Sequence, residues 1–109
     1  MAFSESLAAR IRDALPLSPA ITEKKMFGGI GFFLNGNMLA GILRDSMIVR
    51  LGPEQGHDAL QEPHVREFNI TGKSMKNWII VDPDGIDSDR QLQNWIDRAR
   101  AFVRTLPAK

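Results

Sequence analysis

The stretch KKMFGGIGFF, residues 24–33, determines the fold that we expect for this chain. Three glycines and three phenylalanines fall within ten residues, directly after two lysines, and no amphipathic helix has such a composition. Glycine permits positive φ angles and close approach of two backbones. Phenylalanine fits the half-buried surface of a pleated sheet. The stretch therefore predicts two β-strands that are joined or bent at Gly28-Gly29.

Turn signals divide the following sequence into short strands. Asn35-Gly36-Asn37 favours a hairpin turn, because asparagine and glycine accept positive φ angles. Arg44-Asp45 marks a second turn. Together these signals predict an antiparallel meander with strands at residues 22–27, 30–34, 38–43 and 46–51.

Helices are predicted before, between and after the strands. Residues 3–15 place apolar side chains at helical spacing, and two prolines follow. Pro53 suits the first position of a short helix that extends to about residue 61. Ser88 and Gln91 have the spacing of a capping box at the start of a long apolar stripe, which predicts the last helix.

Two further strands complete the expected fold. Residues 66–70 alternate in polarity, whereas residues 77–81 are nearly all apolar and are expected inside the sheet. The resulting order is α-β-β-β-β-α-β-β-α. This order predicts an α+β fold in which helices pack against an antiparallel sheet. At 109 residues the chain is expected to form a single domain, residues 1–109.

The composition narrows the classes of protein. There are 14 basic and 13 acidic residues, so binding to nucleic acid or to a membrane would need a local patch. The absence of cysteine excludes disulfides and thiolate chemistry. No signal peptide is recognised, and no apolar run approaches the roughly 20 residues of a membrane span. We expect a cytoplasmic protein with no membrane partner.

The glycine cluster has two interpretations. Lys24 and Lys25 before Gly28 and Gly31 suggest a phosphate site. A phosphate cradle, however, requires glycines that open a helix, and this spacing matches no dinucleotide or P-loop motif. We therefore interpret the glycines as a bend or bulge in a strand.

Other arrangements that would indicate catalysis or metal binding are incomplete. His57 and His64 have no third ligand at a zinc-motif spacing. The aspartates around Gly85 lack the ligand positions of an EF-hand and fit a turn followed by a helix cap. No serine lies in a nucleophile elbow. The sequence therefore predicts no catalytic residue, no metal site and no cofactor, and the protein is not expected to be an enzyme.

Basic residues of the predicted sheet suggest a second kind of surface. If several shared one rim they would form a local basic patch, next to which Phe27, Phe33 and Trp78 could stack on bases. Core packing is the expected role of these aromatic side chains, since they lie in apolar strands. The basic residues in question are Lys24, Lys25, Arg44, Arg50, Arg66, Lys73 and Lys76.

Four segments together resemble the TfoX N-terminal domain family, which also occurs in Sxy-type competence regulators. They are KKMFGGIGFFLNGNMLAGI at 24–42, MIVRLGPE at 47–54, REFNITGKSMKNWIIVDPDGI at 66–86, and the closing LQNWIDRARAFVRTLP. The resemblance covers nearly the whole chain in the expected order.

The resemblance implies an α+β fold like that of secretion-chaperone-type domains, and a role without catalysis. Longer relatives regulate DNA-uptake competence genes, in cooperation with the cyclic-AMP receptor protein at promoters. Those relatives carry a second, C-terminal domain. This chain is expected to be a stand-alone N-terminal domain.

We therefore expect a protein-interaction module, with a role in transcriptional regulation of the competence type, that binds a protein partner or forms a homodimer. Direct or indirect nucleic-acid contact through a basic patch is the first alternative, and a small ligand-binding domain or enzyme is the second. The expected interaction surface comprises Lys24, Lys25, Phe27, Gly28, Gly29, Arg44 and Arg50.

Overall fold

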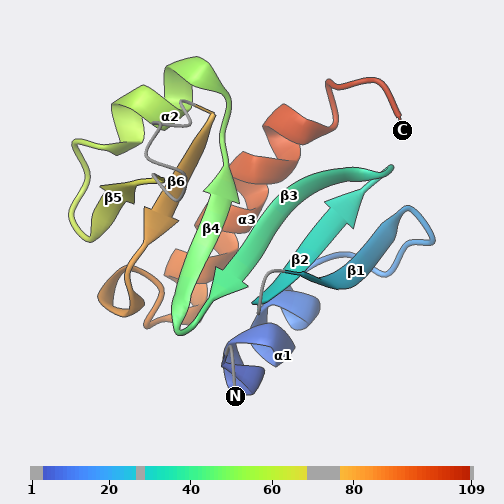
Figure 1. Cartoon of the computed structure of the whole chain (residues 1–109), viewed down its shortest axis with the longest axis horizontal. Coiled ribbons are helices and arrows are strands. Elements are labelled where there is room, and N and C mark those ends of the chain that lie inside the picture. Colours follow the sequence, from blue (N-terminus) through green and yellow to red (C-terminus); the bar gives the residue numbers. More distant parts are fainter. Residues whose placement is uncertain (1–3, 27–28, 69–76, 109) are drawn as a thin grey trace.

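The computed structural model describes residues 4–26, 29–68 and 77–108. They form an open six-stranded sheet with three α-helices (Figure 1). Every neighbouring pair of strands is antiparallel, in the order β1-β2-β3-β4-β6-β5, so the predicted α+β fold and element order are confirmed. The elements are α1 Glu5–Ala14, β1 Ile21–Met26, β2 Gly29–Leu34, β3 Asn37–Leu43, β4 Ser46–Arg50, α2 Pro53–Ala59, β5 Val65–Glu67, β6 Trp78–Val81, a short 3-10 helix η1 Pro83–Gly85, and α3 Asp89–Val103.

Two local signals produce the elements that they predict. Asn35 and Gly36 have φ angles of 53° and 83°, which gives the hairpin between β2 and β3 a two-residue turn with both φ angles positive. At the start of α3, the Ser88 side chain accepts a hydrogen bond from the Gln91 N–H at 3.1 Å. The Gln91 side chain accepts one from the Ser88 N–H at 2.9 Å, which completes the capping box.

Strand β6 occupies the interior position that its apolar sequence predicts. It lies between β4 and β5, and Ile79 and Val81 are buried. Strand β5 is shorter than expected, because it covers Val65–Glu67 instead of residues 66–70. Residues 69 and 70 of that prediction lie outside the described residues.

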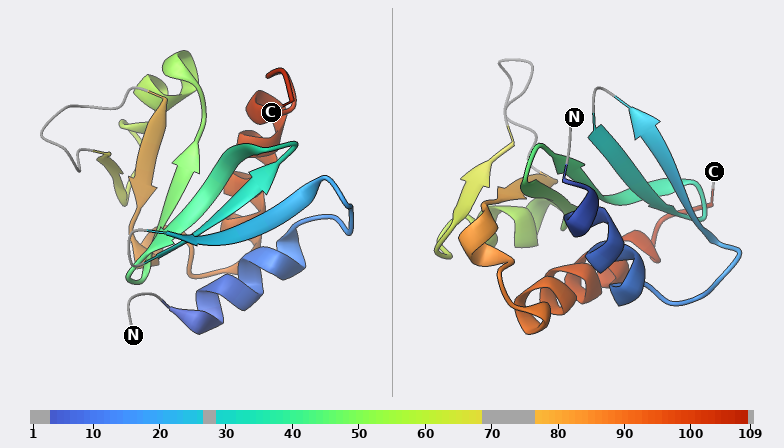
Figure 2. Two further views of the ribbon diagram at one scale, coloured as in Figure 1. Left: turned by 45° about the vertical axis from the view of Figure 1, so that its right-hand side comes forward. Right: turned by 90° about the horizontal axis from the view of Figure 1, so that it is seen from below.

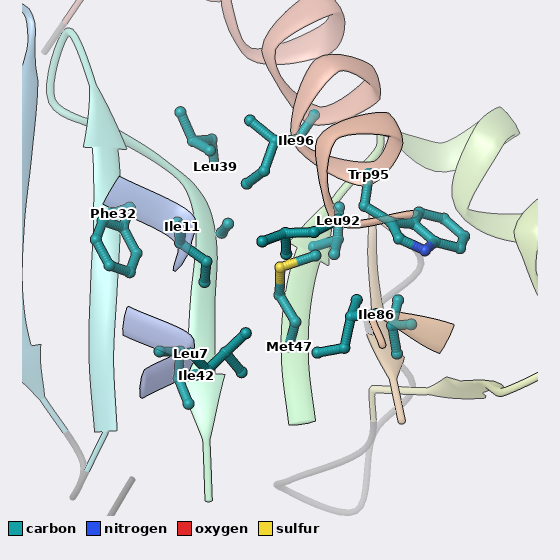
Figure 3. Packing of buried hydrophobic residues seen from close by; sticks show 14 of the residues in the cluster. Leu7, Ile11, Phe32, Leu39, Ile42, Met47, Ile86, Leu92, Trp95 and Ile96 are labelled. Carbon is teal, nitrogen blue, oxygen red and sulfur yellow. The ribbon is translucent and has the colours of Figure 1, made fainter. Parts of the chain in front are cut away.

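The hydrophobic core lies between the sheet and two helices. Helices α1 and α3 cover the same face of the sheet (Figure 2). Side chains of β2, β3 and β4 meet those of α1 and α3 there (Figure 3), and Ile11, Phe32, Met47 and Ile96 have almost no exposed surface. The end of α1 is joined to α3 by a 3.1 Å hydrogen bond from the Gln93 side chain to the Ala14 carbonyl.

A bulge interrupts the pairing of β2 with β3. Phe32 is opposite Ala40 whereas Phe33 is opposite Met38, so Leu39 is an extra residue in β3. Leu39 is fully buried and faces the core (Figure 3). Beyond the bulge β3 curves away from β4 (Figure 1), and the recorded pairing of these strands begins only at Ala40.

The sheet face opposite the helices is also largely apolar. None of the helices in the described ranges lies on this face, which we call the uncovered face. Phe33 and Trp78 are half-buried on it and are not part of the core, so the prediction that they pack in the core is wrong. Phe27 lies outside the described residues. Strand register places one row of residues across this face, namely Lys24, Gly31, Gly41, Ile48, Ile80 and Arg66.

Gly52, at the start of α2, is a position where the fold requires glycine. Its φ angle is 89°, and an added Cβ would lie 2.7 Å from two ring atoms of Phe102. We expect Gly52→Ala to lower the free energy of unfolding by about 2–4 kcal/mol, since it adds overpacking to the cost of a positive φ angle. Gly36→Ala, in an exposed turn with a φ angle of 83°, is the control and should cost only about 1–2 kcal/mol. Urea denaturation measures both, and equal losses would contradict the role of Phe102.

Candidate interaction surface

Strand β1 forms an open edge of the sheet. It is the first strand in the sheet order, and its recorded partner is β2. The Asn35 N–H donates to the Ala20 carbonyl at 2.9 Å, which fixes the alternation of hydrogen bonds along the pair. In an antiparallel ladder, residues in non-hydrogen-bonded pairs direct their N–H and C=O groups away from the partner. Ile21, Glu23 and Lys25 therefore direct both groups away from β2. Because the Ile21 N–H donates to the Ser18 carbonyl at 3.1 Å, Glu23 and Lys25 are the residues that offer both groups to an added strand.

Two lysines follow each other on this edge and point to opposite faces of the sheet. Lys24 is opposite Gly31 and lies on the uncovered face, whereas Lys25 is opposite Ile30 and lies on the helix-covered face. Both lysines are exposed. Because Gly31 has no side chain, the stem of Lys24 has no side chain directly opposite it on β2.

Glu23 ties this edge to helix α1. Both carboxylate oxygens of Glu23 accept hydrogen bonds from Arg12, each at 2.7 Å. This hydrogen bonding is the main reason why the pKa of Glu23 lies below its ordinary value and the pKa of Arg12 lies above its ordinary value; partial burial opposes both shifts. Glu23 is the one acidic residue of β1, and Arg12 engages its carboxylate. The charges that the edge presents are therefore those of Lys24 and Lys25.

Arg44 occupies the turn between β3 and β4. Its φ angle is 61° and its side chain is exposed. Its carbonyl accepts a 2.7 Å hydrogen bond from the Ser4 N–H at the start of α1, which fixes the turn. The turn lies at the same end of the sheet as Met26 and Gly29, two strand spacings or about 10 Å from β1.

Arg50 differs from the other expected surface residues, because it is half-buried. Its guanidinium carbon lies 5.3 Å from the ring centre of Trp78 and 5.9 Å from that of Phe102. One terminal nitrogen donates to the Met38 carbonyl at 3.4 Å, and Nε is buried without a partner among the described residues. Arg50 thus spans the place where β3 and β4 separate, and its participation in binding stays a prediction.

The structure adds apolar side chains that sequence reasoning did not include in the surface. Phe33, Met38 and Leu43 are half-buried on the uncovered face. Of the other expected residues, Gly29 is buried at the start of β2, and Phe27 and Gly28 lie outside the described residues. The adjacent Phe32 and Phe33 contained the missed signal, since successive residues of a strand point to opposite faces. We call Lys24, Lys25, Phe33, Met38 and Arg44 the candidate surface.

Two aspartates of the acidic cluster near Gly85 have basic partners. Asp82 accepts from Arg66 at 2.8 Å, and Asp89 from Arg10 at 3.4 Å. Within the part of the chain that the structure describes, no three His, Asp or Glu side chains are grouped so that they could hold a metal ion. None of the helices in the described ranges has the length and apolar character needed to cross a membrane.

Comparison with known proteins gives one match. The family model of the TfoX N-terminal domain matches residues 13–103, which include every strand and most of the helical residues. No curated protein and no solved structure matches the chain.

The ion pair between Arg12 and Glu23 predicts a dependence of stability on acid pH. Because the folded-state pKa of Glu23 is lowered, its contribution is present above the unfolded pKa and is lost as the pH falls through the folded pKa. Glu23→Gln should therefore lower the free energy of unfolding at pH 7, by less than about 1 kcal/mol since the pair is exposed. The difference from wild type should shrink as the pH falls below the ordinary pKa of a glutamate and through the lowered folded-state pKa of Glu23.

Denaturant titrations across this pH range measure the effect. Glu67→Gln removes an exposed carboxylate of β5 and serves as the control. A loss for Glu23→Gln that is independent of pH would contradict the assignment.

Proposed function

The chain belongs to the TfoX N-terminal domain family, and on this premise we propose that it is a non-catalytic protein-interaction module acting in transcriptional regulation. The observation that carries the proposal is the open edge of β1, bordered by Lys24 and Lys25 and continuous with the half-buried apolar residues of the uncovered face. The regulatory role is proposed by analogy with the competence regulators that the chain resembles.

Strand addition is the mode of binding that this edge supports. Glu23 and Lys25 each offer an N–H and a C=O group to an added strand, which gives up to four main-chain hydrogen bonds. Each such bond contributes roughly 0.5–1.5 kcal/mol net. Side chains of the added strand would meet Lys24 on one face and Lys25 on the other, so a strand with acidic residues on both faces fits best.

Electrostatics favours a distinct acidic partner over a second copy of β1. In a two-fold antiparallel pair of edges, directly opposite residues lie on the same face of the sheet. The register centred on Lys24 places two Lys24 side chains opposite each other, and the register centred on Glu23 does the same for Glu23. The first register also places each Glu23 opposite a Lys25, but the Glu23 carboxylate is already engaged by Arg12. Like charges in direct opposition destabilise a strand pair. Homodimerisation through β1 is therefore the less favoured form of the proposal.

Substituting Lys25 by proline tests strand addition, because the N–H of Lys25 points away from β2 and is absent in proline. Lys25→Pro removes an outward donor at an edge position where proline is tolerated, whereas Lys25→Ala removes the same charge and keeps the donor. Partners captured from native lysate and identified by mass spectrometry should be retained by Lys25→Ala with reduced yield and lost by Lys25→Pro. Equal capture by both variants would contradict strand addition. Light scattering at high micromolar concentration reports whether the captured partner is a second copy.

Nucleic-acid binding is the second candidate, and the exposed charges of Lys24, Lys25 and Arg44 favour it. Such binding should weaken steeply with salt, because each neutralised phosphate releases counterions. Replacing Lys24 and Lys25 by alanine should lower the affinity. It should also reduce the slope of log K against log salt concentration, by about 0.9 for each phosphate of duplex DNA that the variant no longer neutralises. Arg90→Gln, on the exposed face of α3, is the control. Absence of DNA and RNA binding at low salt in electrophoretic and anisotropy assays would remove this candidate.

A further inference from the structure

A groove of about 390 Å³ lies near the Ile21 end of β1, at the opposite end of that strand from Lys25. It is formed by the segment between α1 and β1, the turn between β2 and β3, and the C-terminal half of α3. Its lining residues are Pro16, Ser18, Ile21, Leu34, Asn35, Asp97, Arg100, Ala101 and Arg104.

Hydrogen bonds hold the walls of this groove in place. The Asn35 N–H donates to the Ala20 carbonyl at 2.9 Å and joins the hairpin turn to the start of β1. The Ile21 N–H donates to the Ser18 carbonyl at 3.1 Å and closes the segment that precedes β1. The groove is therefore formed before any ligand arrives, which reduces the entropy cost of binding.

Apolar side chains line part of the groove. Ile21 and Leu34 are directly opposite each other in the β1–β2 register, are half-buried and pack against the core. Ala101 adds a small, exposed side chain from α3. Leu17 lies between two lining residues in the sequence and is fully exposed, the one large hydrophobic residue so exposed among those that the structure describes.

The charged wall of the groove is basic. Arg100 lies in α3 and Arg104 is its C-cap, one helical turn further on and still with helical backbone angles, so both lie on the same side of the helix. Asp97 accepts a hydrogen bond from Gln93 at 2.8 Å and lies 3.7 Å from Arg100. Arg104 has no carboxylate within 4 Å in the described part of the chain. The lining therefore has a net charge of +1, with Arg104 available to an incoming anion.

We propose that this groove docks a segment of a partner protein in which one apolar side chain is flanked by carboxylates. The apolar side chain fits between Ile21, Leu34 and Ala101. The flanking carboxylates meet Arg100 and Arg104, whose planar guanidinium groups can each take a carboxylate through two hydrogen bonds. Charge complementarity favours this ligand over basic or uncharged segments. The site is separate from the proposed β1 edge and does not depend on it.

The test uses a defined set of fluorescent nonapeptides at 50 mM salt. Each peptide has Leu, Ile, Met, Phe or Trp at its centre and two acidic residues on either side, and its matched control has glutamine at the acidic positions. Fluorescence anisotropy should show at least one acidic peptide that binds at least tenfold more tightly than its glutamine control. The double variant Arg100→Gln with Arg104→Gln should lose at least tenfold in affinity, whereas Arg90→Gln, exposed near the other end of α3, should bind like wild type.

A second variant tests the space inside the groove, apart from the charges of the two arginines. Ala101→Glu fills the groove and adds a negative charge at an exposed helical position, so it should abolish binding while circular dichroism stays native. Three outcomes would overturn the proposal. The first is that no acidic peptide binds at 1 mM. The second is that binding survives both sets of substitutions. The third is that light scattering detects self-association and that Leu17→Ser abolishes it, which would assign the groove to a second copy of the chain.

Discussion

Burial of the apolar stripe of α3 against the centre of the sheet is the interaction on which the rest of the structure depends. Ile96 and Ala99 are fully buried, and α3 contacts both β3 and β4. Full burial of one isoleucine side chain contributes about 1.5–3 kcal/mol, and no other helix offers as many such residues. Because α3 and α1 pack on one face, the other face has no helix over it among the described residues, while the strand order leaves β1 at the edge. The groove lies where the C-terminal half of α3 approaches the turn between β2 and β3, so the same packing also supplies one of its walls.

Local signals were sufficient to predict most of the elements. The capping box at Ser88 and the turn at Asn35-Gly36 each act within a few residues, so the sequence contains their whole cause. The bulge at Leu39 was not predicted, because an extra residue in β3 is defined only by its pairing with β2. The different environments of Phe32 and Phe33 follow from that pairing and from the position of the helices.

The sites were less predictable than the fold, for a physical reason. Lys24 and Lys25 were identified by their charge, but their value for binding comes from the edge position of β1, which depends on the order of six strands. Arg50 was chosen on the same chemical grounds, yet the separation of β3 from β4 places it between two aromatic rings. The groove beside Leu17 combines three segments that are distant in sequence, so no local pattern could reveal it.

The contacts of α1 with α3 and with the segment just before α3 also have a kinetic consequence. Arg10 donates to the Ile86 carbonyl at 2.7 Å, and Gln93 to the Ala14 carbonyl at 3.1 Å, across 76 and 79 residues of sequence. Contacts of such long range require closure of most of the chain, which slows folding relative to helical proteins of the same length. During synthesis all six strands leave the ribosome before α3, so the face of the sheet that binds α3 stays exposed until this helix has been made. The nascent chain therefore exposes its most apolar surface at the stage when it is most able to aggregate.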